Sequence, residues 1–129
     1  MAFDPGAVGR AFSEHRFDEA LPYLAKDVRW TIVGYTVLEG ADAVRQTCRE
    51  TLESLEGTTT TYDRCVIAAG SEAVAVVTFA RYTRADGVTA VASCDIYEFT
   101  GDEIAAITSY AVEVAPEDAG SQPLPRVAG

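Results

Sequence analysis

The stretch Val91-Ala-Ser-Cys-Asp95-Ile-Tyr-Glu-Phe99 decides how this 129-residue chain folds. Its β-branched and aromatic residues predict an interior β-strand. Asp95 interrupts that pattern, because an ionised carboxylate buried without partners is so costly that it pairs with a cation or takes up a proton. Either outcome makes the group chemically useful. Arg81, in the preceding predicted strand, is the candidate cation.

Four predicted strands, including this one, fill the C-terminal half of the chain. β-branched residues dominate the segments 58–67, 73–83, 89–99 and 104–114. The three joints between these segments are short and each contains glycine, which is a signal of β-hairpins. We therefore expect an antiparallel meander.

The N-terminal half begins with two predicted helices. Asp4 and Pro5 supply an N-cap and a proline at the first helical position, so the first helix should run from about Pro5 to Glu14. The second helix covers 17–24 and should be short or bent, because Pro22 lies inside it.

A strand at 28–33 follows, and a third helix begins after Asp42 and ends at Gly57. The predicted apolar stripe of this helix consists of Val44, Cys48, Thr51, Leu52 and Leu55. Helices followed by a meander give an α+β architecture, with the helices packed on one face of a curved sheet. This domain should cover residues 1–114, and residues 115–129, rich in proline and glycine, should form a tail.

Composition excludes several classes of protein. The net charge of −10 disfavours nucleic acid and anionic membrane surfaces, which are bound through basic patches. No apolar run approaches the roughly 18 residues that a membrane helix needs. The N-terminus carries Asp4 where a secretory signal has a basic region, so we expect a cytoplasmic protein.

The chain offers few ligands for a metal ion. Cys48, Cys65 and Cys94 form no CxxC pair, and His15 is the one histidine. We expect neither a bound metal nor another cofactor. His15 falls on the connection between the first two helices, and such connections run over the surface, so we expect a solvated side chain there.

Three elements together resemble the nuclear transport factor two-like superfamily: Trp30 on the first strand, Gly34 and Gly40 before the third helix, and the segment 95–110. Its members include SnoaL-like polyketide cyclases, ketosteroid isomerases, limonene epoxide hydrolases and scytalone dehydratase. The resemblance covers about residues 5–114. It implies a cone-shaped, curved antiparallel sheet with three helices of the N-terminal half on its concave face, enclosing an apolar pocket. One fold of this kind hosts many chemistries.

The resemblance also assigns roles to two residues. Asp95 matches the protonated acid that binds the oxyanion in ketosteroid isomerases, and Arg81 matches the arginine between the two catalytic acids of the epoxide hydrolases. The acids of the latter family fall at Thr83 and Ser109, and the isomerase base falls near Thr31 or Ile32. Neither complete mechanism is therefore preserved.

Strand alternation predicts which side chains share a face with Asp95. Across the last hairpin, Asp95 lies opposite Ser109 and Tyr97 lies opposite Ile107. A turn around Asp86-Gly87 puts Arg81 opposite Ser93 and Phe79 opposite Asp95, although a one-residue slip would turn Arg81 to the other face. With Asp95 and Arg81 as catalytic residues, the predicted substrate-binding residues are Trp30, Ile32, Phe79, Thr83, Ser93, Tyr97, Ile107 and Ser109. Cys94 and Ile96 point to the opposite face, where we expect a homodimer interface.

These features support three hypotheses. The first is a cofactor-free enzyme acting on a small, mostly apolar molecule, with Asp95 as general acid or base and Arg81 setting its ionisation or holding an oxyanion. Cyclase, isomerase, dehydratase and hydrolase chemistry all fit, and SnoaL-like cyclisation is the nearest description. The second is a non-catalytic binding module that uses the same pocket. The third is a purely structural dimerisation domain. Separately, Arg81 and Asp95 could form only a structural ion pair.

Overall fold

The computed structural model describes residues 2–118, so residues 119–129 of the predicted tail lie outside the described residues. The elements follow one another along the chain as α1 (Pro5–Ser13), α2 (Phe17–Ala20), a 3-10 turn (Leu21–Tyr23), β1 (Leu24–Ile32), β2 (Thr36–Glu39), α3 (Ala41–Ser54), β3 (Thr59–Ala69), β4 (Ala73–Arg84), β5 (Gly87–Thr100), β6 (Glu103–Val114) and a second 3-10 turn (Pro116–Asp118). The predicted α+β class is confirmed. No helix within residues 2–118 is long and apolar enough to cross a membrane.

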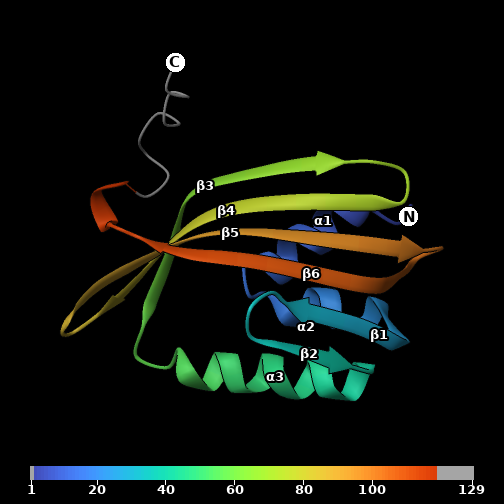
Figure 1. The fold of residues 1–129 in the computed structure, drawn as a ribbon, viewed down its shortest axis with the longest axis horizontal. Helices are drawn as coiled ribbons and strands as arrows, with labels where there is room; N and C mark the ends of the chain where they lie inside the picture. Colours follow the sequence, from blue (N-terminus) through green and yellow to red (C-terminus); the bar gives the residue numbers. More distant parts are fainter. Residues whose placement is uncertain (1, 119–129) are drawn as a thin grey trace.

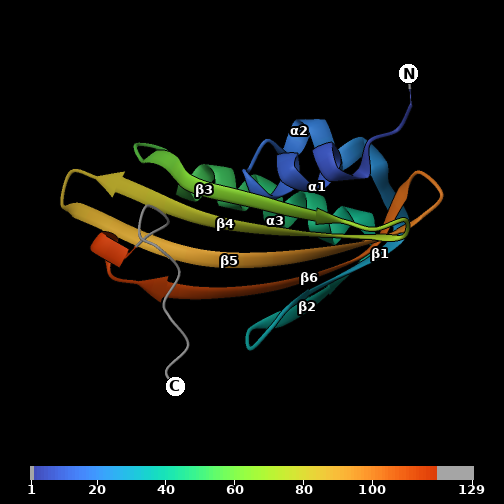
Figure 2. The same cartoon turned by 90° about the horizontal axis from the view of Figure 1, so that it is seen from above.

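Within residues 2–118, six strands form one curved, unclosed sheet in the order β2-β1-β6-β5-β4-β3 (Figure 1). The meander from β3 to β6 is antiparallel, as predicted, whereas β1 runs parallel to β6 and makes the sheet mixed. The helices lie along the concave side (Figure 2). The main core fills the space between that side and the helices, and it includes Val8, Phe12, Phe17, Val28, Val44, Val76, Tyr97, Ile104 and Ile107.

The first helix packs unusually close to the sheet. Its N-cap is Asp4, whose carboxylate accepts a 3.1 Å hydrogen bond from the backbone N–H of Ala7. Gly9 faces the sheet, and a Cβ atom built there would lie 3.0 Å from the ring of Tyr97. The missing side chain therefore lets α1 approach β5, which brings the C-terminal residue of α1, Ser13, within reach of the strand.

The second predicted helix is shorter than the spacing of its apolar residues suggests. It ends at Ala20, a 3-10 turn contains Pro22, and Leu24 already belongs to β1. Proline lacks the N–H that would continue the helix, and it provides the break. The prediction of a helix to Leu24 is wrong, while the predicted shortening at Pro22 is confirmed.

The third helix lies where it is predicted, but its apolar stripe is narrower. Val44 and Cys48 are buried, whereas Leu52 is 47% exposed. The short strand β2, which precedes the helix and pairs with β1, was not predicted. Gly40 joins β2 to α3 with a φ of +94°, a conformation that favours glycine.

One hairpin register is confirmed and the other is wrong. Asp95 lies opposite Ser109 in β6, and Tyr97 lies opposite Ile107. In the preceding hairpin, however, Asp95 lies opposite Val76, not opposite Phe79. The turn there consists of the two residues at 85 and 86, and the following glycine is already part of β5. This tighter turn moves the partner of every β4 residue by three positions, which reverses the two faces of β4 relative to the prediction.

Candidate functional site

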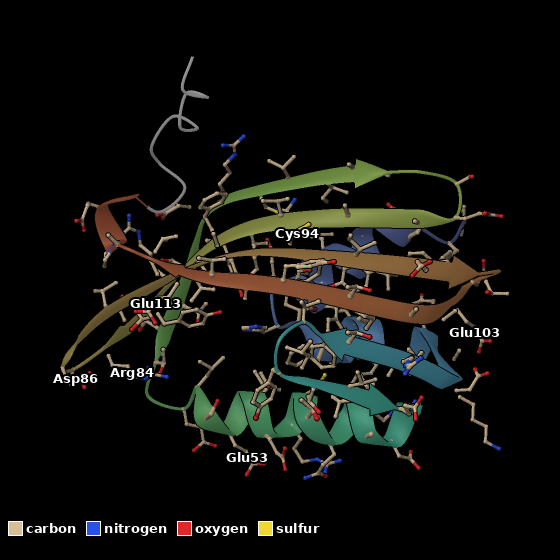
Figure 3. The ribbon with its side chains drawn as sticks, viewed as in Figure 1. Glu53, Arg84, Asp86, Cys94, Glu103 and Glu113 are labelled. Atoms are coloured by element: carbon tan, nitrogen blue, oxygen red, sulfur yellow. The ribbon has the colours of Figure 1, made fainter. Side chains whose placement is uncertain are left out.

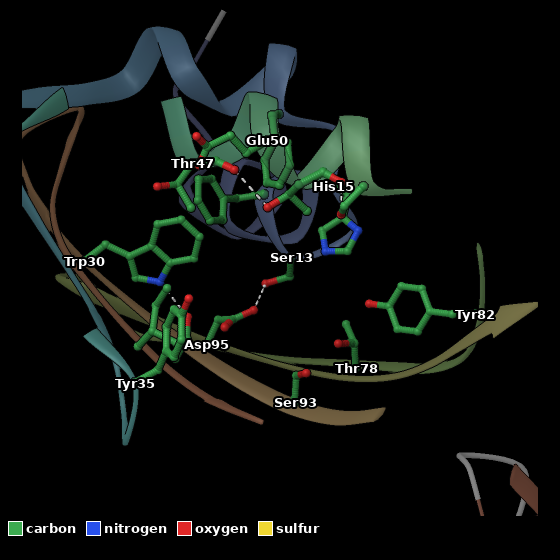
Figure 4. Close-up of a pocket in the computed structure, with 16 residues that line it drawn as sticks. Ser13, His15, Trp30, Tyr35, Thr47, Glu50, Thr78, Tyr82, Ser93 and Asp95 are labelled. Carbon is green, nitrogen blue, oxygen red and sulfur yellow. Dashed lines mark hydrogen bonds between the residues drawn. The ribbon is translucent and has the colours of Figure 1, made fainter. Parts of the chain in front are cut away.

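A pocket of about 440 Å³ lies between the concave face of the sheet, the α1–α2 connection and α3 (Figure 4). This volume is in the range of cavities that hold a single small organic molecule. The lining side chains are Phe12, Ser13, His15, Phe17, Trp30, Ile32, Tyr35, Thr47, Glu50, Thr51, Ser54, Thr78, Tyr82, Ser93, Asp95 and Ser109. Aromatic and hydroxyl groups dominate this set.

Asp95 is the acid at the floor of the pocket, as the sequence predicts. Its Oδ2 atom accepts a 2.7 Å hydrogen bond from the hydroxyl of Ser13. Ser109 also hydrogen bonds to the carboxylate, and the hydroxyl of Tyr97 lies close to it. Burial raises the pKa of Asp95, and the three hydroxyl partners counteract this shift by stabilising the charged form. Burial is the larger effect, so the pKa remains above its usual value.

The donors around this carboxylate form a connected network. Because Ser13 has a single hydroxyl proton and donates it to Asp95, the 2.6 Å contact between Ser13 and Tyr97 requires that Tyr97 donates to Ser13. On the other side, the indole N–H of Trp30 donates a 2.9 Å hydrogen bond to Ser109 Oγ. Ser109 is then free to turn its own proton toward Asp95. The carboxylate is thus held in one orientation by groups from α1, β5 and β6.

Of the predicted substrate-binding residues, four line the pocket: Trp30, Ile32, Ser93 and Ser109. Tyr97 and Ile107 share the concave face with them but are fully buried in the core beneath the helices. They support the site and do not border the cavity.

Three other predicted site residues lie on the far face of the sheet. Because the β4 register differs from the prediction, Arg81, Phe79 and Thr83 alternate with the side chains that face the cavity. Arg81 instead forms an ion pair with Asp63 of the neighbouring strand β3. The predicted pairing of Arg81 with Asp95 is therefore wrong, as is the placement of Phe79 and Thr83 in the pocket.

The residues that replace them on β4 are Thr78 and Tyr82. Both have even residue numbers, whereas Arg81 has an odd one, so their side chains lie on the opposite face of β4 from Arg81. With the correct length of the 85–86 turn, strand alternation would have placed Thr78 and Tyr82 in the pocket. From α3, Thr47, Glu50 and Thr51 supply a polar roof. The prediction that Thr51 belongs to an apolar stripe is wrong. The polar residues at 47, 50, 51 and 54 recur at helical spacing, and this spacing indicates a polar side of the helix.

The prediction of a solvated side chain for His15 is also wrong. It lines the pocket instead of lying in solvent, and its ring stacks at 6.2 Å from that of Tyr82. Burial lowers the pKa of His15, so the imidazole is neutral at physiological pH. A connection between helices is usually exposed, and the sequence pattern alone gave no signal that this one turns inward.

Charge in the pocket has one sign. The ionisable carboxyl groups that border it are those of Asp95 and, on α3, Glu50, while no lysine or arginine of residues 2–118 lines it. Among residues 2–118 there is no cluster of three or more histidine, cysteine, aspartate or glutamate side chains that could hold a metal ion. Within the same range, the three cysteines at 48, 65 and 94 are free thiols. The arrangement is suited to proton transfer at Asp95 in a largely apolar cavity.

Comparison with known proteins agrees with this geometry. The sequence model of the SnoaL-like domain family matches residues 7–107. No curated protein matches the chain. Among solved structures, an NTF2-like protein of unknown function from Cytophaga hutchinsonii is 28% identical, with a TM-score of 0.72 over 82% of this chain and 94% of that one.

Two more distant structures share the fold. An NTF2-like protein from Anabaena variabilis is 12% identical, with a TM-score of 0.68 over 87% of this chain and 94% of that chain. A protein from Xanthomonas campestris, proposed to be a polyketide cyclase, is 18% identical, with a TM-score of 0.62 over 81% of this chain and 84% of that one.

Proposed function

Because the chain belongs to the SnoaL-like domain family, we propose that it is a cofactor-independent enzyme that acts on a small, mostly apolar molecule through general acid–base chemistry at Asp95. The observation that carries this proposal is the environment of the carboxyl group. Asp95 stands at the floor of an aromatic pocket, is held by hydroxyl groups from both sides, and has a pKa raised by burial.

A raised pKa suits a carboxylate for proton transfer. It makes the ionised form a stronger base than a solvated aspartate, and it brings the protonation equilibrium closer to neutral pH. In the ionised state Asp95 would remove a proton from the bound molecule and then return it at a second position. Cyclisation, isomerisation and dehydration contain such a step, with the proton passed to the departing hydroxyl in dehydration. In hydrolysis Asp95 would take the proton from an attacking water molecule and pass it to the leaving group. Cyclisation is the first choice, since a structural neighbour is itself proposed to be a polyketide cyclase.

The test is turnover by an Asp95→Asn variant with candidate polyketide and terpenoid substrates. The amide keeps the shape of the acid but cannot take up the proton. Positioned acid–base groups contribute about 10²- to 10⁴-fold in rate, and we expect a loss of that size. Asp86→Asn, at the tip of the β4–β5 hairpin, is the matched control and should leave turnover unchanged (Figure 3). A fully active Asp95→Asn enzyme would disprove the assignment.

One observation favours the alternative, a non-catalytic binding module. Asp95 already accepts hydrogen bonds from Ser13 and Ser109, and the Tyr97 hydroxyl lies beside it, so much of its capacity is used by the protein itself. A carboxylate used in this way can serve as a fixed anchor for a hydroxyl group of the ligand. In that case wild-type protein would bind the candidate molecules without converting them, and Asp95→Asn would weaken binding.

We also propose that the chain forms a homodimer through the convex face of the sheet. Neighbouring residues across four strands form an apolar row there: Val66, Val77, Cys94 and Tyr110. Val112, which lies next along β6 on this face, is 63% exposed. Cys94 lies near the middle of the sheet, whereas charged side chains such as Arg84 and Glu103 stand at the hairpin ends (Figure 3). An apolar area of this kind is typical of a protein interface, and isologous pairing is the commonest arrangement.

A further inference from the structure

His15 is held in one position by the backbone around it. After α1 ends, the N–H of His15 donates to the carbonyl of Phe12 at 3.1 Å, and the N–H of Arg16 donates to the carbonyl of Ala11 at 2.8 Å. His15 has a φ of +62°, a left-handed conformation that few residues other than glycine adopt. This tight reversal turns the imidazole toward the sheet and places the ring at the pocket wall.

Two aromatic rings then fix the orientation of the imidazole. The ring of Phe17 lies 5.4 Å away, and Tyr82 stacks on His15 with an interplanar angle of 27°. These contacts come from two different elements, α2 and β4. A side chain held in this way loses little further freedom when it binds a ligand.

The surroundings of the two ring nitrogens determine where the proton resides. Nδ1 of His15 is buried and has no hydrogen-bond partner within residues 2–118. Nε2 is not among the buried, unpaired atoms of that range. An unpaired buried N–H is costlier than an unpaired acceptor lone pair. The neutral ring therefore carries its proton on Nε2. Protonation of Nδ1 would create a buried N–H without an acceptor, in agreement with the lowered pKa of His15.

The distribution of side chains gives the pocket two different ends. Figure 4 shows Trp30 and Tyr35 on one side, His15 and Tyr82 on the other, and Asp95 between them. The first end is aromatic, and the second presents hydrogen-bonding groups. Of the described residues at the pocket, the charged ones are Asp95 and Glu50. Both are acidic, so an anionic ligand would be repelled.

We propose that the Nε2–H group of His15 binds an oxygen acceptor of an uncharged ligand, such as a ketone or ester carbonyl, while the apolar body of the ligand lies against Trp30. His15 is thus a specificity-determining residue that places the carbon atoms next to the carbonyl near Asp95. This inference rests on the proposed function only in assuming that the pocket binds a small molecule.

The experiment compares three probes of nearly equal size by titration calorimetry: 2-acetylnaphthalene, which has a carbonyl group, 2-isopropylnaphthalene, which lacks it, and the anion 2-naphthoate. One hydrogen bond corresponds to about a 5- to 10-fold difference in affinity, so the ketone should bind that much more tightly than the hydrocarbon. The naphthoate should bind more weakly than the ketone.

The same titrations are repeated with His15→Phe and His15→Gln. Phenylalanine keeps the ring between Phe17 and Tyr82 but removes both nitrogens, so the preference for the ketone should disappear. Glutamine has an amide N–H that can reach a similar position, and it should restore part of the preference. Melting temperatures show which variants remain folded, and the ratio of the two affinities is compared only among folded proteins.

An Asp95→Asn variant separates this proposal from the proposed function. If His15 binds the oxygen, the ketone preference persists in Asp95→Asn although turnover is lost. The ketone preference could instead survive in folded His15→Phe or be lost in Asp95→Asn. Either result would assign the ketone oxygen to Asp95 and overturn the role of His15. Acid–base chemistry at Asp95 would still stand. Tighter binding of the naphthoate, or no binding of any probe, would also overturn it.

Discussion

Ser13 Oγ and Asp95 Oδ2 lie 2.7 Å apart although 82 residues separate them in sequence. The contact joins the end of α1 to the middle of β5, and it exists because Gly9 lets the helix approach the ring of Tyr97. The same hydroxyl contacts Tyr97 OH at 2.6 Å. Ser13 is thus a positioning residue for the candidate catalytic carboxylate.

Ser13→Ala should destabilise the protein and raise the pKa of Asp95 further. The change removes one donor to the carboxylate and leaves the buried Tyr97 hydroxyl without its present partner, which costs about 1–3 kcal/mol in the free energy of unfolding. Urea denaturation measures the first effect, and the acidic limb of the rate profile should move to higher pH. Ser54→Ala, which removes one exposed hydrogen bond to a carbonyl, should change stability by no more than about 0.5 kcal/mol. Equal stability of the two variants would contradict the network.

Asp95→Asn should stabilise the protein at neutral pH. Burial raises the pKa of Asp95 in the folded state above the 3.8 of the unfolded state, so the native protein binds the proton more tightly. The stability associated with this group is therefore complete below pH 3.8 and is lost as pH rises through the folded pKa. Asparagine does not ionise, and at pH 8 the variant should gain about 1 kcal/mol over wild type. The gain should shrink at pH 4, and urea midpoints at both pH values measure it. If the ionised form of Asp95 stabilised the folded protein, Asp95→Asn would instead lower the midpoint at pH 8.

Arg81 should be energetically coupled to Asp63 and not to Asp95. The ion pair with Asp63 is partly exposed, with 27% and 21% of the two side chains accessible, so its coupling should be about 0.5–1 kcal/mol. A double-mutant cycle with Arg81→Met and Asp63→Asn measures this value. The matched cycle of Arg81→Met with Asp95→Asn should be additive, because the two side chains lie on opposite faces of the sheet. Strong coupling in the second cycle would restore the pairing that the sequence suggested.

Val112→Glu should convert the expected homodimer to a monomer. The side chain is 63% exposed on the convex face, and an interface there would bury an introduced charge from each chain without a partner. Light scattering at micromolar concentration gives the mass of both proteins. Leu52→Glu, at an exposed position on α3 on the helix side of the sheet, is the control and should leave the dimer intact. A wild-type mass equal to one chain would contradict the proposed interface.

Asp95 and Ser109 could be placed together from sequence because the last hairpin has a short turn and side chains alternate along each strand. Arg81 could not be placed, since the face of every residue on β4 depends on the length of the turn at 85–86. The length of this one turn therefore decided the predicted positions of Arg81, Phe79 and Thr83. The family resemblance was more robust, because it depends on the order of the elements.

His15 was missed for a different physical reason. Its position depends on a single left-handed residue after α1 and on ring contacts with residues from α2 and β4. Neither leaves a periodic pattern in the sequence, which is the main signal for helices and strands. The polar residues of α3 were more accessible, because Thr47, Glu50 and Thr51 recur at helical spacing on one side.

Trp30 gives the pocket its own optical reporter. It is the chain's single tryptophan, so the whole indole emission arises at this position. Its N–H donates to Ser109, and Ser109 in turn hydrogen bonds to Asp95. Loss of the negative charge on Asp95 would turn the Ser109 hydroxyl and alter the electric field at the indole. The wavelength and intensity of the emission should therefore follow both the ionisation of Asp95 and the arrival of a ligand, without any label attached to the protein.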